Sequence, residues 1–410
     1  MSSILYLQFD TEVKMKKKKI RLFISFLLML FLTGGYLVTN DIVPSSWTIA
    51  GWVLLLIISA LSVRKNDSNI VKSAVTMILF FVISSIYNTE PSYRTVALTV
   101  SFFTATIFAM SISFEEFKKS YSDVMFFLSA VSLFAFFFFK LFPGLAVFNV
   151  VYNTSGTPAS NFFLYIVNDY DRNMGMFWEP GAFQAFVSLA LLFTIMEPQF
   201  NMKRVGVFVF TIITTFSTTG YFALMIIIVL IILRWGTIGT KSKRVMKYLA
   251  IPMVALFLYA SFDMLMNTST NSVFGKLISF NEQGGLAGGT DTGSTAIRFL
   301  AITKPIEAFF QSPIFGKGYV GLQDELMVYT RGMNTCTFVN WFAMYGIIFG
   351  VLMIVGVFKF SKKVHPTRRW WIILFFFIIT ISENFATSAF FFTVALMGYK
   401  GEEELAKTVL

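Results

Sequence analysis

Apolar stretches of roughly helix length recur along the chain from residue 20 to residue 398, separated by short polar breaks. A helix needs roughly 20 mostly apolar residues to cross a bilayer core, so the pattern predicts an all-α fold, a polytopic transmembrane helix bundle of about 12 spans. The predicted spans lie near 20–39, 44–63, 70–87, 94–114, 120–142, 181–197, 205–217, 220–235, 247–265, 335–358, 370–382 and 385–399. Four of them are short and form two pairs that could be tilted or re-entrant hairpins.

Two of the breaks are much longer than a turn. They cover about residues 143–180 and 266–334, and both mix aromatic and apolar residues with Arg, Asp and Glu. Loops of this length are usually functional or disordered, and the mixed composition favours ordered segments packed on the membrane domain. Apolar residues recur at helical spacing between Ser294 and Gln311, which predicts an amphipathic surface helix with Pro305 as a place where it could kink.

Breaks between successive predicted spans lie alternately on the two sides of the membrane, and positive charge gathers in the breaks on one side. Most Lys and Arg residues fall in the short breaks on that side, which identifies it as cytoplasmic. We therefore predict a cytoplasmic N-terminal extension at 1–19, a transmembrane domain at 20–399 and a cytoplasmic tail at 400–410. The two long loops, about 143–180 and 266–334, then lie outside. The formal net charge of +11 reflects topology and does not indicate a nucleic-acid partner.

The amino-acid composition is that of a membrane protein and excludes several kinds of site. Apolar residues make up 56% of the chain and charged residues 13%, a balance that water-soluble domains do not have. The single cysteine, Cys336, excludes a disulfide framework and a cysteine-ligated zinc site. The sequence has no Gly-rich phosphate loop and no His-Glu-x-x-His, so we expect no ATP hydrolysis, no metal and no organic cofactor. Asp169 and Asp171 have the acid-x-acid spacing of some metal-dependent sugar transferases, but such pairs are common in loops.

A first polar constellation precedes the sixth span, from Asp169 to Gln184. Proline suits the first helical position and disfavours helical geometry in the residue before it, so the span is predicted to begin at Pro180 with Glu179 as its cap. A carboxylate at that position meets unpaired backbone N–H groups and the positive end of the helix dipole. Glu179 is therefore either a structural cap or a functional group that accepts a proton from a hydroxyl or positions Arg172.

A second constellation combines Arg298, the segment from Ser312 to Gly318, Arg331 and Asn340. Arginines on the outer side are not needed for topology, and the planar arginine fork binds phosphate oxygens through two parallel hydrogen bonds. Arg172, Arg298 and Arg331 could therefore converge on a diphosphate. Salt bridges with nearby acids, or contacts with anionic headgroups, are the alternative explanation.

The order of these features resembles the O-antigen polymerase and O-antigen ligase superfamily, whose members are membrane-embedded enzymes with a glycosyltransferase C-like fold. The resemblance covers roughly residues 150–360. It rests on Arg172-x-x-Gly175-x-Phe177-x-Glu179-Pro180-Gly181, the Ser-Thr-Thr-Gly turn at 217–220, Arg298 at the start of a loop helix, and Pro313-Ile314-Phe315-Gly316-x-Gly318 ahead of Asn340 and Gly346.

The resemblance implies a polymerase that joins undecaprenyl-diphosphate-linked oligosaccharide repeats of a surface polysaccharide, whether O-antigen, capsule or exopolysaccharide. The reaction would take place at the outer leaflet of the bacterial cytoplasmic (inner) membrane. The expected partners are these lipid-linked oligosaccharides, the lipid bilayer, and a chain-length regulator and a flippase of the same pathway. The implied catalytic residues are Glu179, Arg172 and Arg298, and the implied substrate-binding residues are Arg331, Asn340, Lys317 and Gly181.

One departure separates the chain from the ligases of this superfamily. They typically carry a histidine before the asparagine of the late span, whereas Val339 precedes Asn340 and the sole histidine, His365, lies in a basic break on the cytoplasmic side. This favours a polymerase, with a ligase-type transferase as the alternative. A flippase or other transporter should have internal repeats, broken helices in matching halves and mid-span charges, which the sequence does not indicate. A purely structural scaffold would leave the long loops unexplained.

Overall fold

The computed structural model describes residues 2–63, 67–147, 150–152, 158–167, 172–197, 201–235, 294–330, 334–381 and 383–401. The described chain is mostly helical. It divides into two compact units. The first unit comprises Met1–Val75, Val96–Phe216 and Ser388–Leu410, and the second comprises Thr76–Thr95 and Ser217–Thr387.

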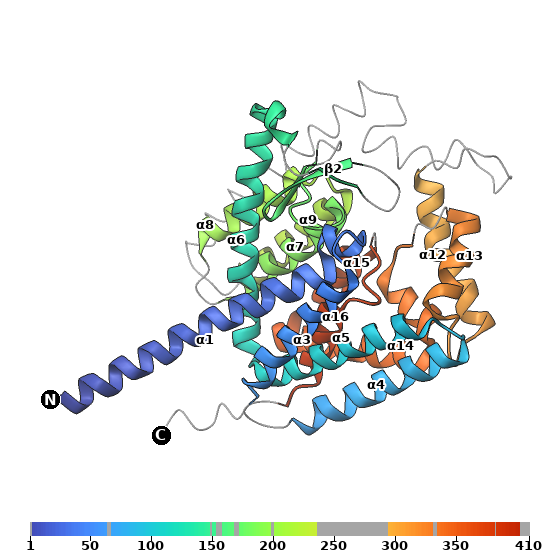
Figure 1. Cartoon of the computed structure of the whole chain (residues 1–410), viewed down its shortest axis with the longest axis horizontal. Coiled ribbons are helices and arrows are strands. Elements are labelled where there is room, and N and C mark those ends of the chain that lie inside the picture. Colours follow the sequence, from blue (N-terminus) through green and yellow to red (C-terminus); the bar gives the residue numbers. More distant parts are fainter. Residues whose placement is uncertain are drawn as a thin grey trace. The chain divides into compact units, whose positions relative to one another are not determined.

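Most elements belong to one unit each (Figure 1). The first unit contains α1 (Ser2–Gly34), α2 (Tyr36–Thr39), α3 (Ser45–Ala60), α6 (Phe114–Leu141), the 3-10 helix η1 (Pro143–Val147), β1 (Val150–Tyr152), β2 (Pro158–Phe162), β3 (Tyr165–Val167), α7 (Pro180–Met196), α8 (Met202–Thr214) and α16 (Ala389–Tyr399). The second unit contains α9 (Thr218–Trp235), α12 (Ser294–Gln311), α13 (Gly318–Thr330), α14 (Thr337–Val364), the 3-10 helix η2 (Pro366–Arg368) and α15 (Arg369–Ile381). Helices α4 (Ser68–Tyr87) and α5 (Ser92–Ser111) are divided between the units.

Within the described residues, four helices are long and apolar enough to cross a membrane: α4, Tyr93–Ser111 of α5, α6 and α14. At about 1.5 Å of rise per residue, a helix of roughly 20 residues spans the hydrocarbon core. These helices identify a membrane protein. Shorter apolar helices cover Ser45–Ala60, Pro180–Met196, Thr218–Ile231 and Ala389–Tyr399.

The positions of the helices agree with the apolar stretches of the sequence. Each predicted span that falls on described residues corresponds to a helix, and the predicted surface helix is α12. The predicted span at 247–265 lies outside the described residues, as does most of the long break at 266–334 before residue 294. Helix α13 was not predicted, because it lies in a segment interpreted as loop. The total of about 12 spans and the assignment of membrane sides stay predictions.

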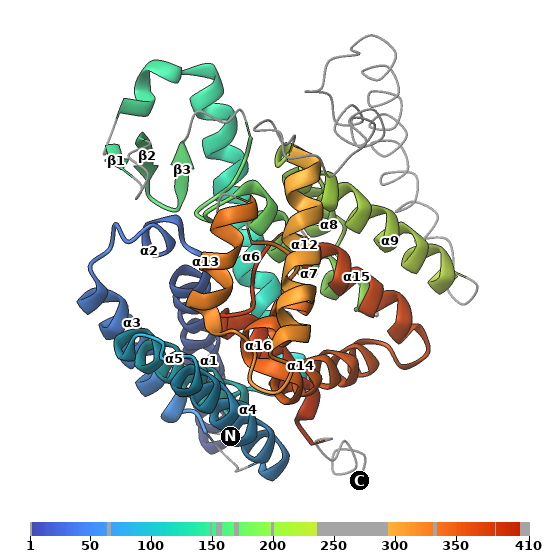
Figure 2. The same ribbon diagram turned by 90° about the vertical axis from the view of Figure 1, so that its right-hand side faces the viewer.

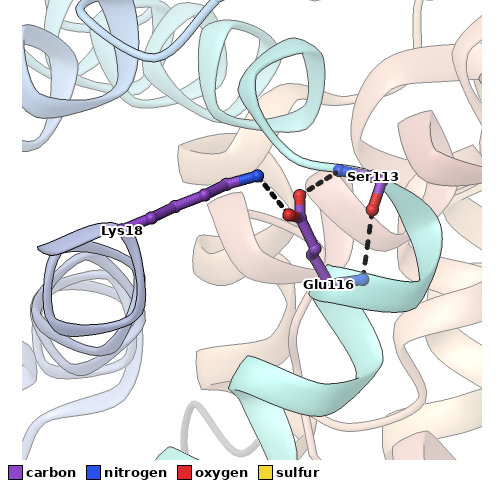
Figure 3. Close-up of polar contacts among 3 residues, drawn as sticks. All are labelled: Lys18, Ser113 and Glu116. Carbon is purple, nitrogen blue, oxygen red and sulfur yellow. Dashed lines mark hydrogen bonds and ion pairs between the residues drawn. The ribbon is translucent and has the colours of Figure 1, made fainter. Parts of the chain in front are cut away.

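Helix α6 begins six residues earlier than the apolar pattern predicts, because a capping box starts it. The Ser113 hydroxyl accepts a hydrogen bond from the Glu116 backbone N–H (3.2 Å), and a Glu116 carboxylate oxygen accepts one from the Ser113 backbone N–H (3.2 Å). The Lys18 ammonium of α1 donates to the other carboxylate oxygen (Figure 3). One glutamate therefore both starts α6 and ties it to α1.

The opposite end of α6 packs against a small antiparallel sheet, ordered β1-β2-β3. In it Val151 pairs with Ala159 and Asn161 pairs with Ile166. The strands lie beside the C-terminal end of α6, where the ring of Tyr165 stacks on Phe139 (Figures 1 and 2). The fold is therefore not purely helical, which corrects the all-α prediction. The described part of the break at 143–180 is folded, as expected.

Helix α7 forms the interior of the first unit. Every residue from Pro180 to Ile195 is buried, and the helix contacts both α6 and α8. A helix that is apolar on all sides is stable only when other elements surround it. The polar loop that precedes α7 is consequently attached to the most deeply buried element of this unit.

In the second unit, α12 and α13 lie side by side and pack on α14 (Figure 2). Helix α14 is broken at Gly346, whose backbone angles are φ 80° and ψ 179°. The break frees backbone groups that a continuous helix would pair. The turn at 313–317, which we call the plug segment, pairs two of them: Lys317 N–H donates to the Ala343 carbonyl (2.8 Å) and Ile347 N–H donates to the Pro313 carbonyl (2.9 Å).

Helix α4 reinforces the broken region from another side. The Ser84 hydroxyl lies 3.1 Å from the Met344 carbonyl and also hydrogen-bonds the Phe315 carbonyl. Asn88 Nδ2 donates to the Gly316 carbonyl (3.3 Å). Backbone groups of α14 and of the plug segment are thus bonded to each other and to α4, as a membrane interior requires.

We expect Gly346→Ala to destabilise the protein by more than about 2 kcal/mol, because its backbone conformation is nearly exclusive to glycine. A Cβ at this position would also lie 1.9 Å from the Ile314 carbonyl oxygen. Thermal unfolding of purified protein in detergent measures the effect as a lower Tm. The matched control is Gly206→Ala in α8, where an added Cβ meets nothing within 4 Å among the described residues. Equal Tm values for the two variants would contradict this account of the break.

Candidate functional site

The predicted motif at 172–181 is a folded loop between β3 and α7. Asn173 is fully buried and holds its start in place. Its Nδ2 donates to the hydroxyls of Thr214 (3.0 Å) and Ser132 (3.3 Å), while its Oδ1 accepts from Gly175 N–H (3.0 Å). Its backbone N–H donates to the Thr214 carbonyl (2.9 Å). The loop is therefore fixed by a buried side-chain network and not only by its ends.

The middle of the loop is tied to neighbouring backbone. Gly175 accepts a hydrogen bond at its carbonyl from Ile166 N–H of β3 (2.8 Å), and Met176 accepts one from Tyr36 N–H of α2 (2.8 Å). Gly175 has φ 55°, and a Cβ there would lie 3.1 Å from the ring of Phe183. Backbone conformation and space both explain this motif glycine.

Arg172 is anchored at the end of another helix. Its Nε donates to the carbonyl of Thr215 (2.8 Å), the residue that follows the last turn of α8. A guanidinium at this position interacts favourably with the negative end of a helix dipole. The bond uses one of the five N–H donors of the group and orients the plane of the fork. Arg172 consequently has a structural role, and that role also sets the direction of its terminal nitrogens.

Glu179 occupies the predicted N-cap position of α7, but its carboxylate does not cap the helix as predicted. Helix α7 begins at Pro180, with Glu179 as an extended N-cap residue, so the predicted start is confirmed. The predicted carboxylate cap is wrong, because the exposed Glu179 side chain makes no capping hydrogen bond to the first turn. An extended backbone is usual for an N-cap residue, so the missing bond reflects the position of the Glu179 side chain and not its backbone conformation. Gly181 is buried in the first turn of α7.

Asn340 lies at the start of α14 in the second unit and is fully buried. Its Nδ2 donates to Asn334 Oδ1 (2.7 Å) and to the Thr335 carbonyl (2.7 Å). Lys317 lies in the plug segment, where its backbone N–H donates to the Ala343 carbonyl. Arg298 belongs to α12, but its side chain lies outside the described residues, and Arg331 lies outside them altogether. The convergence of three arginines stays a prediction.

The carboxylate of Glu90 and the backbone carbonyl of Glu383, neither of them among the predicted site residues, hold segments of the second unit together. Glu90 Oε1 accepts a hydrogen bond from Val320 N–H (2.8 Å) in the first turn of α13. Glu383 is buried, and its carbonyl accepts from the Thr337 hydroxyl (2.9 Å), which in turn accepts from Phe385 N–H (2.9 Å). The available signal for Glu383 was an acid inside an apolar region, which in a membrane is rarely incidental.

The single cysteine is not a candidate nucleophile. Cys336 is buried at the start of α14, with φ 61°. Its side chain is 1% exposed, and buried structural cysteines of this kind are inert because a substrate cannot reach the sulfur.

No family model matches the chain, and a search of curated proteins found no match. Within the described residues, no group of three His, Cys, Asp or Glu side chains could hold a metal ion.

We expect Asn173→Ala to destabilise the protein by about 2–4 kcal/mol, because it leaves buried groups of Gly175 and Thr214 unpaired. Thermal unfolding in detergent provides the measurement, with Asn69→Ala as the control because Asn69 is exposed on the first turn of α4. An unchanged Tm for Asn173→Ala would show that the loop is held by other contacts.

Proposed function

We propose that this membrane protein is a glycosyltransferase that polymerises undecaprenyl-diphosphate-linked oligosaccharide repeats at the outer leaflet of the bacterial cytoplasmic membrane. The observation that carries the proposal is the folded loop at 172–181. It anchors the guanidinium of Arg172 through Nε and presents the exposed Glu179 carboxylate at the start of the buried helix α7. An oriented cation and a carboxylate on one rigid loop are the groups that transfer from a lipid diphosphate requires.

The proposed reaction needs no nucleotide, because the lipid-linked donor is already activated. A hydroxyl of one repeat attacks the anomeric carbon of the growing chain. The new bond joins that carbon to the hydroxyl oxygen, and the bond from the carbon to the diphosphate oxygen breaks. Glu179 receives the hydroxyl proton, and Arg172 stabilises the negative charge on the departing undecaprenyl diphosphate. The alternative role of Glu179 is to position Arg172.

The remaining candidate residues extend this assignment. Arg298 and Arg331 are proposed as further ligands of the diphosphate. Asn340 and Lys317 are proposed to contact the substrate, and Gly181 to shape its approach at the start of α7. A flippase that supplies the repeats and a chain-length regulator are the proposed protein partners.

Contacts within the first unit support the proposed topology. Lys400 Nζ donates to the Ala109 carbonyl (3.1 Å), and Gly401 N–H donates to an Asp67 carboxylate oxygen (2.7 Å). All three segments fall on the proposed cytoplasmic side. So do Lys18 and Glu116, which form the ion pair at the start of α6. The small sheet, assigned to the outside, packs at the opposite end of that helix.

In the second unit, too, residues that are bonded to each other fall on the same proposed side of the membrane. Thr337 and Glu383, which are hydrogen-bonded, both fall on the proposed outer side. Arg368 and Leu233, which are also hydrogen-bonded, both fall on the cytoplasmic side. If the number of membrane crossings predicted between two such segments were wrong by one, the bonded residues would fall on opposite sides of the membrane.

Among the described residues, the broken helix α14 is a feature that a transporter would share. In transporters, the backbone groups freed by a break coordinate ions or substrate. Here the plug segment binds the Ala343 carbonyl and Ile347 N–H, so these groups are already satisfied by protein. The break therefore favours a structural insertion over a transport site.

We expect Arg172→Lys to lower the rate of polymerisation by about one to two orders of magnitude, nearly as much as Arg172→Ala. A lysine cannot replace the oriented fork, and a lost charge-assisted contact costs about 1.5–3 kcal/mol. Polymer length on gels, at matched membrane levels of protein, gives the readout. Arg204→Lys is the control, because Arg204 pairs with Asp123 through charge at the proposed cytoplasmic side. Full activity of Arg172→Lys would mean that charge alone is sufficient.

Deletion of the gene should leave single repeats on undecaprenyl diphosphate that are exposed at the outer leaflet. Mass spectrometry of lipid-linked glycans, combined with their accessibility to an added glycosidase in spheroplasts, identifies the step. Long chains that stay on the carrier would indicate a ligase instead. Single repeats that the glycosidase cannot reach would indicate a flippase.

A further inference from the structure

Two hydrogen-bonded side-chain amides lie at the start of α14, that of the buried Asn340 and that of the partly exposed Asn334. Asn340 Nδ2 donates to Asn334 Oδ1 and to the Thr335 carbonyl, each at 2.7 Å. Because a backbone carbonyl can only accept, this second bond fixes the orientation of the Asn340 amide, and the Asn334 amide must then turn its oxygen toward it. The orientation of both amides follows from the hydrogen bonds themselves.

This arrangement leaves one donor and one acceptor unused. Two facing amides can form two hydrogen bonds, but here only one forms. Asn334 Nδ2 and Asn340 Oδ1 have no partner among the described residues. Thr335 Oγ1 and Trp341 Nε1, both buried, likewise have none in the described part of the chain. We call these four side chains the polar cluster: Asn334, Thr335, Asn340 and Trp341.

Such a concentration of unmet hydrogen bonds is unusual. Buried polar groups are normally paired, and each exception calls for an explanation such as a ligand or a bound water. Some hydroxyls of the same unit are satisfied, as in Thr337 and Thr380, which bond to backbone carbonyls. Single buried groups without a partner among the described residues also occur elsewhere in this unit, at Ser85, Glu90, Tyr345, Arg368 and Arg369, whereas four of them gather between residues 334 and 341.

The chemistry of the cluster distinguishes between two parts of a lipid-linked substrate. A diphosphate offers only acceptor oxygens at neutral pH, so it would be repelled by the unpaired Asn340 oxygen. A sugar hydroxyl, or the N-acyl group of an amino sugar, both donates and accepts. Groups of this kind match a cluster that offers unused donors, at Asn334 and Trp341, an unused acceptor, at Asn340, and a hydroxyl at Thr335 that can do either.

We propose that the polar cluster binds a hydroxyl or N-acyl group of the glycan, and not the diphosphate. This proposal rests on the proposed function and adds a sugar subsite within the second unit, formed by Asn334, Thr335, Asn340 and Trp341.

The test compares Thr335→Val with Thr380→Val, which removes a hydroxyl that is satisfied within α15. Removal of an unsatisfied buried hydroxyl should leave the Tm of Thr335→Val unchanged or raised. Sugar binding by the same variant should fall about two- to tenfold, the equivalent of one neutral hydrogen bond. Thr380→Val should not change sugar binding. Asn334→Ala, at a partly exposed position, serves as a second variant of the cluster.

Binding is measured by saturation-transfer NMR on the full chain in nanodiscs. The probes are N,N′-diacetylchitobiose, which carries N-acyl groups, cellobiose, which carries only hydroxyls, and inorganic diphosphate. We expect at least one disaccharide to be saturated by the wild type, with loss in Thr335→Val and Asn334→Ala and no loss in Arg172→Lys. The preferred disaccharide then tells whether the N-acyl group or the hydroxyl is recognised.

Several results would overturn the proposal. Unchanged disaccharide signals in both cluster variants would mean that water satisfies these groups, and so would a wild type that saturates neither disaccharide. Displacement of the disaccharide by diphosphate would mean that the cluster takes phosphate. If the variants lose sugar binding while a deletion strain still assembles full-length polymer, the polymerase assignment fails and the sugar site stands.

Discussion

A helix that breaks inside a membrane must replace the backbone hydrogen bonds it loses, because lipid offers neither donors nor acceptors. In α14 the break at Gly346 is repaired by Pro313 and Lys317, whose backbone groups take the partners that the helix gave up. This exchange fixes the turn between α12 and α13 against α14, and Ser84 of α4 is bonded to both sides of it. Much of the second unit is therefore arranged around one repaired break.

Buried backbone groups must also be paired in the first unit, where the side chain of Asn173 pairs them. Asn173 pairs with backbone and hydroxyl groups of α6, α8 and its own loop, so the polar segment ahead of α7 can lie against a fully buried helix. The glycines that gave the chain its resemblance to polysaccharide polymerases are explained by such close approaches. Gly175 packs on Phe183, and Gly316 would place a Cβ 2.3 Å from the Met344 carbonyl oxygen. These positions belong to the scaffold, which leaves the charged residues between them as the candidates for chemistry.

The helices were predictable because apolar length alone determines where a chain can cross a membrane. Their ends were less so. The start of α6 depends on Ser113 and Glu116, a capping signal in a charged stretch that an apolar pattern ignores. The three-stranded sheet was missed although Val150 to Tyr152 are residues typical of strands and turn formers follow them. The break in α14 could not be predicted, because nothing local to Gly346 reveals the segment more than 25 positions earlier that fills it.

For the candidate site, too, the sequence predicts some features, and others follow only from the fold. Pro180 marks Glu179 in the sequence, but the bond from Arg172 to Thr215 joins residues from different elements and follows only from the fold. Sequence can name polar residues, whereas only structure tells which of them are already satisfied. Asn173 and Asn340 are both buried asparagines, and only Asn340 was a candidate from the sequence. Asn173 uses both its donor and acceptor atoms within the protein, while Asn340 Oδ1 and Asn334 Nδ2 have no partner among the described residues. A membrane protein tolerates that cost most readily where a substrate supplies the missing partners, so the unpaired asparagine is the one to assign to binding.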